Sequence, residues 1–226
     1  MNSKDSNADS SASARPHRYM PEIFNATNLD DAKRIILTPI RGTSTEERWI
    51  KESEYLTDDV GRTMKLKRDS CIIDYGCGIG RLARGLIDRY HCSVVGVDIS
   101  VTMRQLGPGY VQSPRFWSCA PESLDEVVKK GFAADGAICI WVLQHCLNPA
   151  ADIQRISQSV RRGGFLYVLN NYIRAVPTDQ GWLNDGVDIR ALLRRSFIEL
   201  HHRHLPVDTT IQPIAEQTFI GVFEKR

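Results

Sequence analysis

The chain has 226 residues, of which 42% are hydrophobic and 25% are charged, so its composition is that of a folded protein and excludes disorder throughout. This length predicts one large domain or at most two small ones. Twenty-nine Lys and Arg against 27 Asp and Glu leave a formal net charge of +2. That charge is too small for a broad surface that binds nucleic acid or an anionic membrane, although a local basic patch stays open.

The N-terminal segment Met1–Ala14 consists mainly of Ser, Asn, Asp and Ala and has no apolar core, so we expect a disordered tail rather than a signal peptide. We interpret residues 1–40 as this tail and a lead-in, and residues 41–226 as a single domain. No stretch has the roughly 20 apolar residues that span a bilayer. The six cysteines form no C-x-x-C pair and no zinc spacing, so we expect reduced thiols, no metal site and a cytoplasmic protein.

A helix is predicted over residues 45–64. The sequence Ser44-Thr-Glu-Glu47 is typical of a capping box. Apolar residues then recur near helical spacing at Trp49, Leu56, Val60 and Met64. Two roles stay open for this helix: a lid over a site, with contributions from Arg48, Trp49 and Tyr55, or packing on a sheet.

From residue 71 onward, short apolar runs alternate with helical patterns. Residues 71–76 and 93–99 indicate buried strands, and residues 81–90 between them a helix, which is a β-α-β unit. Further strands are predicted at 115–119, 136–141 and 165–170, and helices at 122–130 and 151–161. Residues 197–205 and 218–224 indicate an antiparallel pair, with no helical period between them. The fold class is therefore α/β, a doubly wound and mainly parallel sheet covered on both faces.

The most informative stretch is a glycine-rich turn between the first strand and its helix. Gly76, Gly78 and Gly80 allow a sharp turn and the close approach of a ligand to the backbone. Asp98 stands at the end of the next strand, where a carboxylate can accept hydrogen bonds from a ribose diol. A helix cap or a turn is the structural alternative for Asp74 and Asp98.

An NAD site is one interpretation, because residues 78–83 match G-x-G-x-x-A and Asp98 follows Gly78 by 20 residues. Three observations oppose it. Asp74 stands at the end of the strand before the first glycine, the glycines occupy the alternate positions Gly76, Gly78 and Gly80, and the chain has no Tyr-x-x-x-Lys pair. The chain also has no room for a separate catalytic domain of the kind that dehydrogenases usually need.

Four motifs occur in order: DYGCGIG at 74–80, VVGVDIS at 94–100 followed by Met103, WVLQH at 141–145 and RRGGFLYVLNN at 161–171. Together they resemble a class I S-adenosylmethionine-dependent methyltransferase of the small-molecule type. The resemblance covers about residues 70–226. It implies S-adenosylmethionine as cofactor and a Rossmann-like sheet of seven strands, six parallel and one antiparallel near the C-terminus.

The resemblance also implies the cofactor contacts. They are Asp74, Gly76, Cys77, Gly78, Gly80, Asp98, Ile99, Met103, Cys119, Ala120, Ile140 and Trp141. Asp98 would bind the ribose hydroxyls, and Ile99 and Met103 would flank the adenine. Cys119 departs from the family, which often has an acidic residue there, and a thiol is a weak acceptor. Glu122 is the alternative acceptor for the adenine amino group.

Acceptor recognition is expected at the carboxyl edge of the sheet, after the fourth and fifth strands. The candidates there, together with Trp49 of the leading helix, are Gln144, His145, Asn170, Asn171, Tyr172, Arg174 and Trp182. His145 is the candidate catalytic base, and orientation of its loop is the alternative. The Arg174 guanidinium would suit a carboxylate or a phosphate. His201, His202 and His204 alternate on a strand, so we interpret them as an exposed strand face and not as a metal site.

The leading hypothesis is methyl transfer to an O or N atom of a small-molecule acceptor, with no membrane partner and no nucleic acid. An RNA or protein methyltransferase is the second hypothesis. It is motivated by five arginines in the C-terminal half: Arg161, Arg162, Arg194, Arg195 and Arg203. A noncatalytic protein that binds the cofactor or a partner is the third.

Overall fold

The computed structural model describes residues 16–226, so the expected tail Met1–Ala14 lies outside the described residues. The helices are η1 Pro21–Phe24, α1 Leu29–Ile36, α2 Thr45–Thr63, α3 Arg81–Tyr90, α4 Val101–Val111, α5 Pro121–Lys129, α6 Pro149–Ser159, α7 Ile189–Ser196 and α8 Gln212–Gln217. The strands are β1 Cys71–Tyr75, β2 Ser93–Val97, β3 Phe116–Cys119, β4 Ala134–Ile140, β5 Val160–Asn171, β6 Val176–Thr178, β7 Gly181–Leu183, β8 Phe197–Arg203 and β9 Thr218–Lys225.

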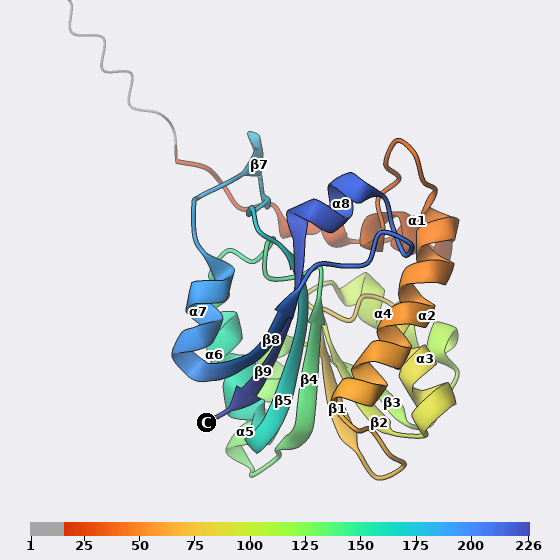
Figure 1. The fold of residues 1–226 in the computed structure, drawn as a ribbon, viewed down its shortest axis with the longest axis vertical. Coiled ribbons are helices and arrows are strands. Elements are labelled where there is room, and N and C mark those ends of the chain that lie inside the picture. The colour runs from red at the N-terminus through yellow and green to blue at the C-terminus, as the bar shows by residue number, and fades with distance from the viewer. Residues whose placement is uncertain (1–15) are drawn as a thin grey trace, which may run out of the picture.

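Seven strands form one sheet in the order β3-β2-β1-β4-β5-β9-β8 (Figure 1). Strand β1 pairs in parallel with β2 and β4, β2 with β3, and β4 with β5. Strand β9 pairs antiparallel with both β5 and β8. The predicted sheet, with six parallel strands and one antiparallel C-terminal strand, is therefore confirmed.

Helices cover both faces of the sheet (Figure 1). Strand β1 shows why, because Ile72 and Ile73 alternate in direction and are both fully buried, each in a different core. One core takes Leu56 of α2 and Leu86 of α3, and the other takes Leu193 of α7 together with residues of α5 and α6. The continuous apolar strands predicted this two-faced burial.

Polar side chains fix where five of the helices begin. Each cap oxygen accepts a hydrogen bond from the backbone N–H three residues later, which satisfies a donor that the helix leaves unpaired. The caps are Asn28, Ser44, Ser100, Asn148 and Asp188. The Ser44 cap places the start of α2 where the capping box predicted it.

The structure differs from the predicted elements in several places. Helix α8 occupies Gln212–Gln217, where no helix was expected, because six residues are too few to produce a helical period. Helix α4 was not predicted, since Gly107, Pro108 and Gly109 lie inside it. Helix α7 and the small β6–β7 hairpin were also missed, and α6 ends at Ser159 because β5 begins at Val160.

The lead-in from residue 16 to residue 40 is built into the fold. Tyr19 forms a bridge with Thr178 of β6, and Ala32 and Leu37 are buried in a third apolar cluster with Ile79 and Met103. We call residues 18–26 the N-terminal strap. It runs from the β6–β7 hairpin to the N-terminal end of α4, above the carboxyl edge of the sheet (Figure 1).

Three further observations bear on the expected site. All six cysteines are unpaired. No group of three or more His, Cys, Asp or Glu among residues 16–226 is arranged to hold a metal ion. Within the same residues, no helix is both long and apolar enough to cross a membrane.

Candidate active site

A cavity of about 750 Å³ opens at the carboxyl edge of β1, β2 and β4. The structure brings ten of the predicted site residues into its wall: Gly76, Gly78, Asp98, Ile99, Met103, Ile140, Trp141, Gln144, His145 and Asn171. The cavity therefore lies where the parallel strands end, which is the usual position of a ligand site in an open α/β sheet.

The turn after β1 forms a cradle that only glycine fits. Gly76 and Gly78 have φ angles of +77° and +54°, in the left-handed region that side chains disfavour. A Cβ on Gly76 would lie 2.1 Å from Val142 Cγ2, and one on Gly78 would lie 2.6 Å from Ile36 Cδ1. The bare backbone of this turn is thus the cavity wall.

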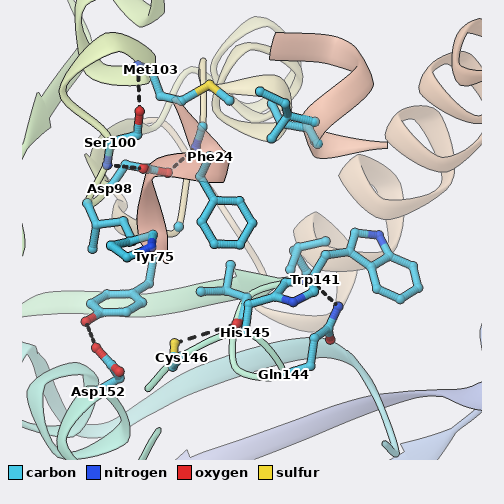
Figure 2. A pocket seen from close by; sticks show the side chains of 18 of the residues that line it. Phe24, Tyr75, Asp98, Ser100, Met103, Trp141, Gln144, His145, Cys146 and Asp152 are labelled. Atoms are coloured by element: carbon cyan, nitrogen blue, oxygen red, sulfur yellow. Dashed lines mark hydrogen bonds between the residues drawn. The ribbon is translucent and has the colours of Figure 1, made fainter. Parts of the chain in front are cut away.

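The Asp98 carboxylate bridges this turn and helix α4. Its Oδ2 accepts a hydrogen bond from the Gly78 N–H at 2.8 Å, and its Oδ1 accepts one from the Ser100 N–H at 2.8 Å (Figure 2). Burial raises the pKa of Asp98, and these two backbone donors oppose that rise. Each oxygen keeps a further acceptor position, so the carboxylate can receive the two hydroxyls of a ribose.

Asp74, Cys77 and Gly80 lie next to the cavity wall without belonging to it. Asp74 is buried, and burial raises its pKa to about 7, while the Arg81 guanidinium opposes the rise. Cys77 is buried with its thiol on the carbonyl of Gly78, and Gly80 caps α3. These residues support the turn from behind.

Around Ile99, where the sequence predicted the adenine contacts, the cavity wall is composed differently from that prediction. Ile99 lines the cavity and is 50% exposed, which leaves an apolar surface for a flat ring. Cys119 and Ala120 are not in the wall, and Glu122 is exposed outside it, whereas Pro121 and Asp152 are in it. Asp152 accepts a hydrogen bond from the Tyr75 hydroxyl at 2.5 Å, and no sequence signal pointed to it.

The protonation of His145 follows from its neighbours. Gln144 Oε1 accepts a hydrogen bond from the Asn171 N–H, so the Gln144 amide nitrogen is the donor toward His145 Nε2 at 3.2 Å. The other ring nitrogen lies 2.7 Å from the carbonyl of Ala175, which only accepts. His145 is therefore the neutral tautomer that carries its proton on Nδ1.

Burial, and then the nearby Arg174 charge, lower the pKa of His145, while the Ala175 carbonyl opposes this shift. Its ring lies between two aromatic side chains, with centroids 5.5 Å from Phe24 and 5.3 Å from Trp182. In Figure 2 the Phe24 ring points into the middle of the pocket, toward His145. Two hydrogen bonds and two ring contacts thus hold the imidazole in place.

The remaining predicted acceptor contacts, Trp49, Asn170, Tyr172, Arg174 and Trp182, are not in the cavity wall. Arg174 is only 2% exposed, and its guanidinium donates hydrogen bonds to both oxygens of Asp185 and to the carbonyl of Leu143. Asn170 accepts from the Gln144 N–H. Arg174 is thus a fixed support of the loop and has no free face for an anionic acceptor.

Trp49 and Tyr172 are also committed to other contacts. The Trp49 indole N–H donates to the Tyr110 hydroxyl at 3.2 Å. Tyr172 packs against Phe219 and His202 on the β8–β9 side.

The N-terminal strap contributes to the cavity wall, which the sequence analysis did not predict. Phe24 and Asn25 line the cavity, the Ala26 N–H donates to Thr102 Oγ1, and the Ser100 hydroxyl donates to Asn25 Oδ1. Composition held a signal, because residues 19–37 contain aromatic and aliphatic side chains that Met1–Ala14 lacks.

A family model described as "Methyltransferase domain" matches residues 48–217. The chain belongs to this methyltransferase family. With the seven-stranded fold and the glycine cradle, this makes it a class I S-adenosylmethionine-dependent methyltransferase. No curated protein matches the sequence closely enough to serve as a relative.

Solved structures share the fold at low identity. A putative sarcosine dimethylglycine methyltransferase from Galdieria sulphuraria has a TM-score of 0.63 and 12% identity, over 83% of this chain and 90% of that one. A geranyl diphosphate methyltransferase in complex with GPP and sinefungin has a TM-score of 0.58 and 14% identity, over 77% and 78%. The [4+2]-cyclase SpnF has a TM-score of 0.59 and 16% identity, over 76% and 81%.

Proposed function

We propose that this methyltransferase transfers the methyl group of S-adenosylmethionine to an O or N atom of a small-molecule acceptor. The observation that carries the proposal is the cover over the cavity. The N-terminal strap crosses it from Pro177 and Asp179 to Thr102, with hydrogen bonds at both ends. A cavity of about 750 Å³ under such a cover suits a small acceptor better than a folded macromolecule.

The residues fit the cofactor in two respects that the structure supports. Gly76 and Gly78 leave backbone where a side chain would fill the space, and Asp98 presents acceptors for a diol. When bound, S-adenosylmethionine supplies a methyl group on a positively charged sulfur, which is already activated for displacement.

The protein's task is then alignment and exclusion of water. Phe24 and Trp182 enclose His145, and Gln144 links the loop after β4 to the end of β5 through Asn170 and Asn171. Because His145 Nε2 already accepts a hydrogen bond from Gln144, we assign His145 a positioning role toward the acceptor rather than that of the base.

The RNA or protein alternative loses much of its motivation in the structure. Three of the arginines that suggested it are ion-paired: Arg161 with Asp135, Arg194 with Glu199 and Arg203 with Asp59. If RNA were the acceptor, binding would appear at low salt and weaken steeply as salt rises. We expect no binding to an unstructured RNA at low salt.

The test of the proposed function is turnover with a filtered metabolite extract and S-adenosylmethionine that carries an isotopically labelled methyl group. Mass spectrometry should find a labelled small molecule together with S-adenosylhomocysteine. Since SpnF shows that a [4+2]-cyclase shares this fold, detection of the labelled product, and not of bound cofactor, is required. Labelled RNA or protein without any labelled metabolite would contradict the small-molecule assignment.

A further inference from the structure

A buried ionic cluster beside the cavity is formed by Arg48 and Glu52 of helix α2 and by Arg81, the first residue of helix α3. Arg48 Nε donates to Glu52 Oε1 at 2.7 Å, and Arg81 Nη1 lies 3.8 Å from Glu52 Oε2. Arg48 is 5% exposed and Glu52 0%. Two buried guanidinium groups thus share one buried carboxylate, and charges in such surroundings need a partner of opposite sign.

Asp74 does not fully balance this charge. It forms no ion pair with either guanidinium in the described part of the chain, and burial favours its uncharged form by raising its pKa to about 7. The cluster therefore keeps an excess of positive charge at the side of the cavity.

Arg48 is the member of the cluster that reaches the cavity wall. Its Nε is bound to Glu52 and its Nη1 donates to the carbonyl of Thr38 at 3.2 Å. Its Nη2 has no hydrogen-bond partner among the residues that the structure describes. A buried guanidinium with an open donor on a ligand cavity is suited to an anion.

Trp141 links the same cluster to the end of β4. Its indole N–H donates to Glu52 Oε2 at 3.3 Å, and the Arg48 guanidinium lies 5.9 Å from its ring centroid. Trp141 has a φ angle of +63°, a left-handed conformation that costs free energy for a residue with a side chain. The contacts of Glu52 hold both the strained Trp141 and the guanidinium in place.

Opposite charges lie on the two sides of the cavity. Asp98 and Trp141 lie on opposite sides of Phe24 in Figure 2. The Asp98 carboxylate is therefore on one side, and the ionic cluster, which Trp141 contacts through Glu52, is on the other. A carboxylate on the ligand is repelled by Asp98 and attracted by Arg48. A zwitterionic cofactor with a diol at one end and a carboxylate at the other is therefore oriented by this pair.

We infer that Arg48 binds the α-carboxylate of the methionine part of S-adenosylmethionine, with Glu52 as the residue that positions its guanidinium. This assignment rests on the proposed use of the cofactor. An anionic group of the acceptor is the competing occupant of Arg48, and the experiment separates the two.

The experiment compares two ligands by calorimetry: S-adenosylmethionine and its decarboxylated derivative, which differ only in the carboxylate. Arg48→Gln is the informative variant, because Arg81 and the Trp141 indole remain as partners for Glu52. Arg48→Lys keeps the charge, and Lys51→Gln removes an exposed charge from the same helix as a control. Thermal melting establishes that each variant is folded.

We expect the wild type to bind S-adenosylmethionine more tightly than the decarboxylated derivative. Arg48→Gln should weaken binding of S-adenosylmethionine by about 10- to 100-fold, which is the value of a buried charge-assisted contact. It should leave binding of the decarboxylated derivative unchanged or slightly improved, since a positive charge is removed from beside a cationic ligand. Arg48→Lys should fall between, and Lys51→Gln should match the wild type.

Equal losses for both ligands would mean that Arg48 only supports the fold, and an unchanged affinity for S-adenosylmethionine would leave Arg48 to the acceptor. Either result overturns the assignment while leaving the proposed function in place. A wild type that binds neither ligand contradicts the proposed function as well.

Discussion

The Gln144 amide nitrogen lies 3.2 Å from Nε2 of His145 and donates a hydrogen bond to it. The one candidate base among the predicted acceptor contacts thus has its free lone pair occupied before any acceptor binds. Its pKa is also lowered by burial, which keeps the ring neutral.

Replacement of His145 by Gln should reduce kcat by less than about tenfold and leave the pH profile of kcat/KM unchanged, because a positioning residue does not titrate in the mechanism. Steady-state rates between pH 6 and 9 check this. A loss of about 10²- to 10⁴-fold, with the disappearance of one ionisation from the profile, would instead identify a general base.

The lowered pKa of His145 also makes stability depend on pH. The folded protein holds fewer protons at this site than the unfolded chain, whose histidine titrates near 6.5. The contribution of His145 to the free energy of unfolding is therefore fully present above that pH and declines as the pH falls below it. Denaturant unfolding of His145→Gln should give a flatter dependence between pH 5 and 7 than the wild type. His201→Gln, at an exposed position on β8, is the control and should keep the wild-type slope.

Asp74 makes stability depend on pH in the opposite direction. Its pKa is raised from 3.8 to about 7, so its contribution to stability is largest below pH 3.8 and is lost as the pH rises through 7. Asp74→Asn should raise Tm at pH 8 by roughly 2–6 °C and raise it less at pH 5, where only part of the contribution has been lost because the native carboxyl is protonated and the unfolded one is ionised. A lower Tm at pH 8 would show that the attraction between Asp74 and the Arg81 charge outweighs the burial cost. Asp69→Asn, on the exposed turn before β1, should change Tm at neither pH.

Phe24 is expected to retain the bound cofactor, because its ring lies in the pocket under the N-terminal strap. Phe24→Ala should speed dissociation of S-adenosylhomocysteine by about tenfold in stopped-flow fluorescence, since most affinity changes at one site appear in the off-rate. Ile23→Ala removes an exposed neighbouring side chain and should dissociate at the wild-type rate. Identical rates for the two variants would remove Phe24 from this role.

The sequence predicted the sheet well because its information there is local. The apolar run of β1, the glycines of the turn and Asp98 on the next strand each have a clear physical signature, and the parallel pairing of Asp74 with Gly96 brings them together. The capping box at Ser44 likewise located the start of α2.

The parts that could not be predicted depend on contacts between distant segments. Arg174 was expected to face an anion, but Asp185, eleven residues away, occupies its guanidinium. The contribution of Phe24 depends on where the strap crosses the sheet, which no periodicity encodes. Cys119 matched a family position by spacing, whereas the cavity wall beside it is formed by Pro121 and Asp152.

Calorimetric titration with S-adenosylhomocysteine is the most direct test of the cavity between the glycine cradle and Asp98 as the cofactor site. We expect one site of micromolar affinity in the wild type, a loss of about 100-fold in Asp98→Ala, and no change in the exposed control Asp88→Ala. Absence of binding by the wild type, or equal affinity in Asp98→Ala, would contradict it.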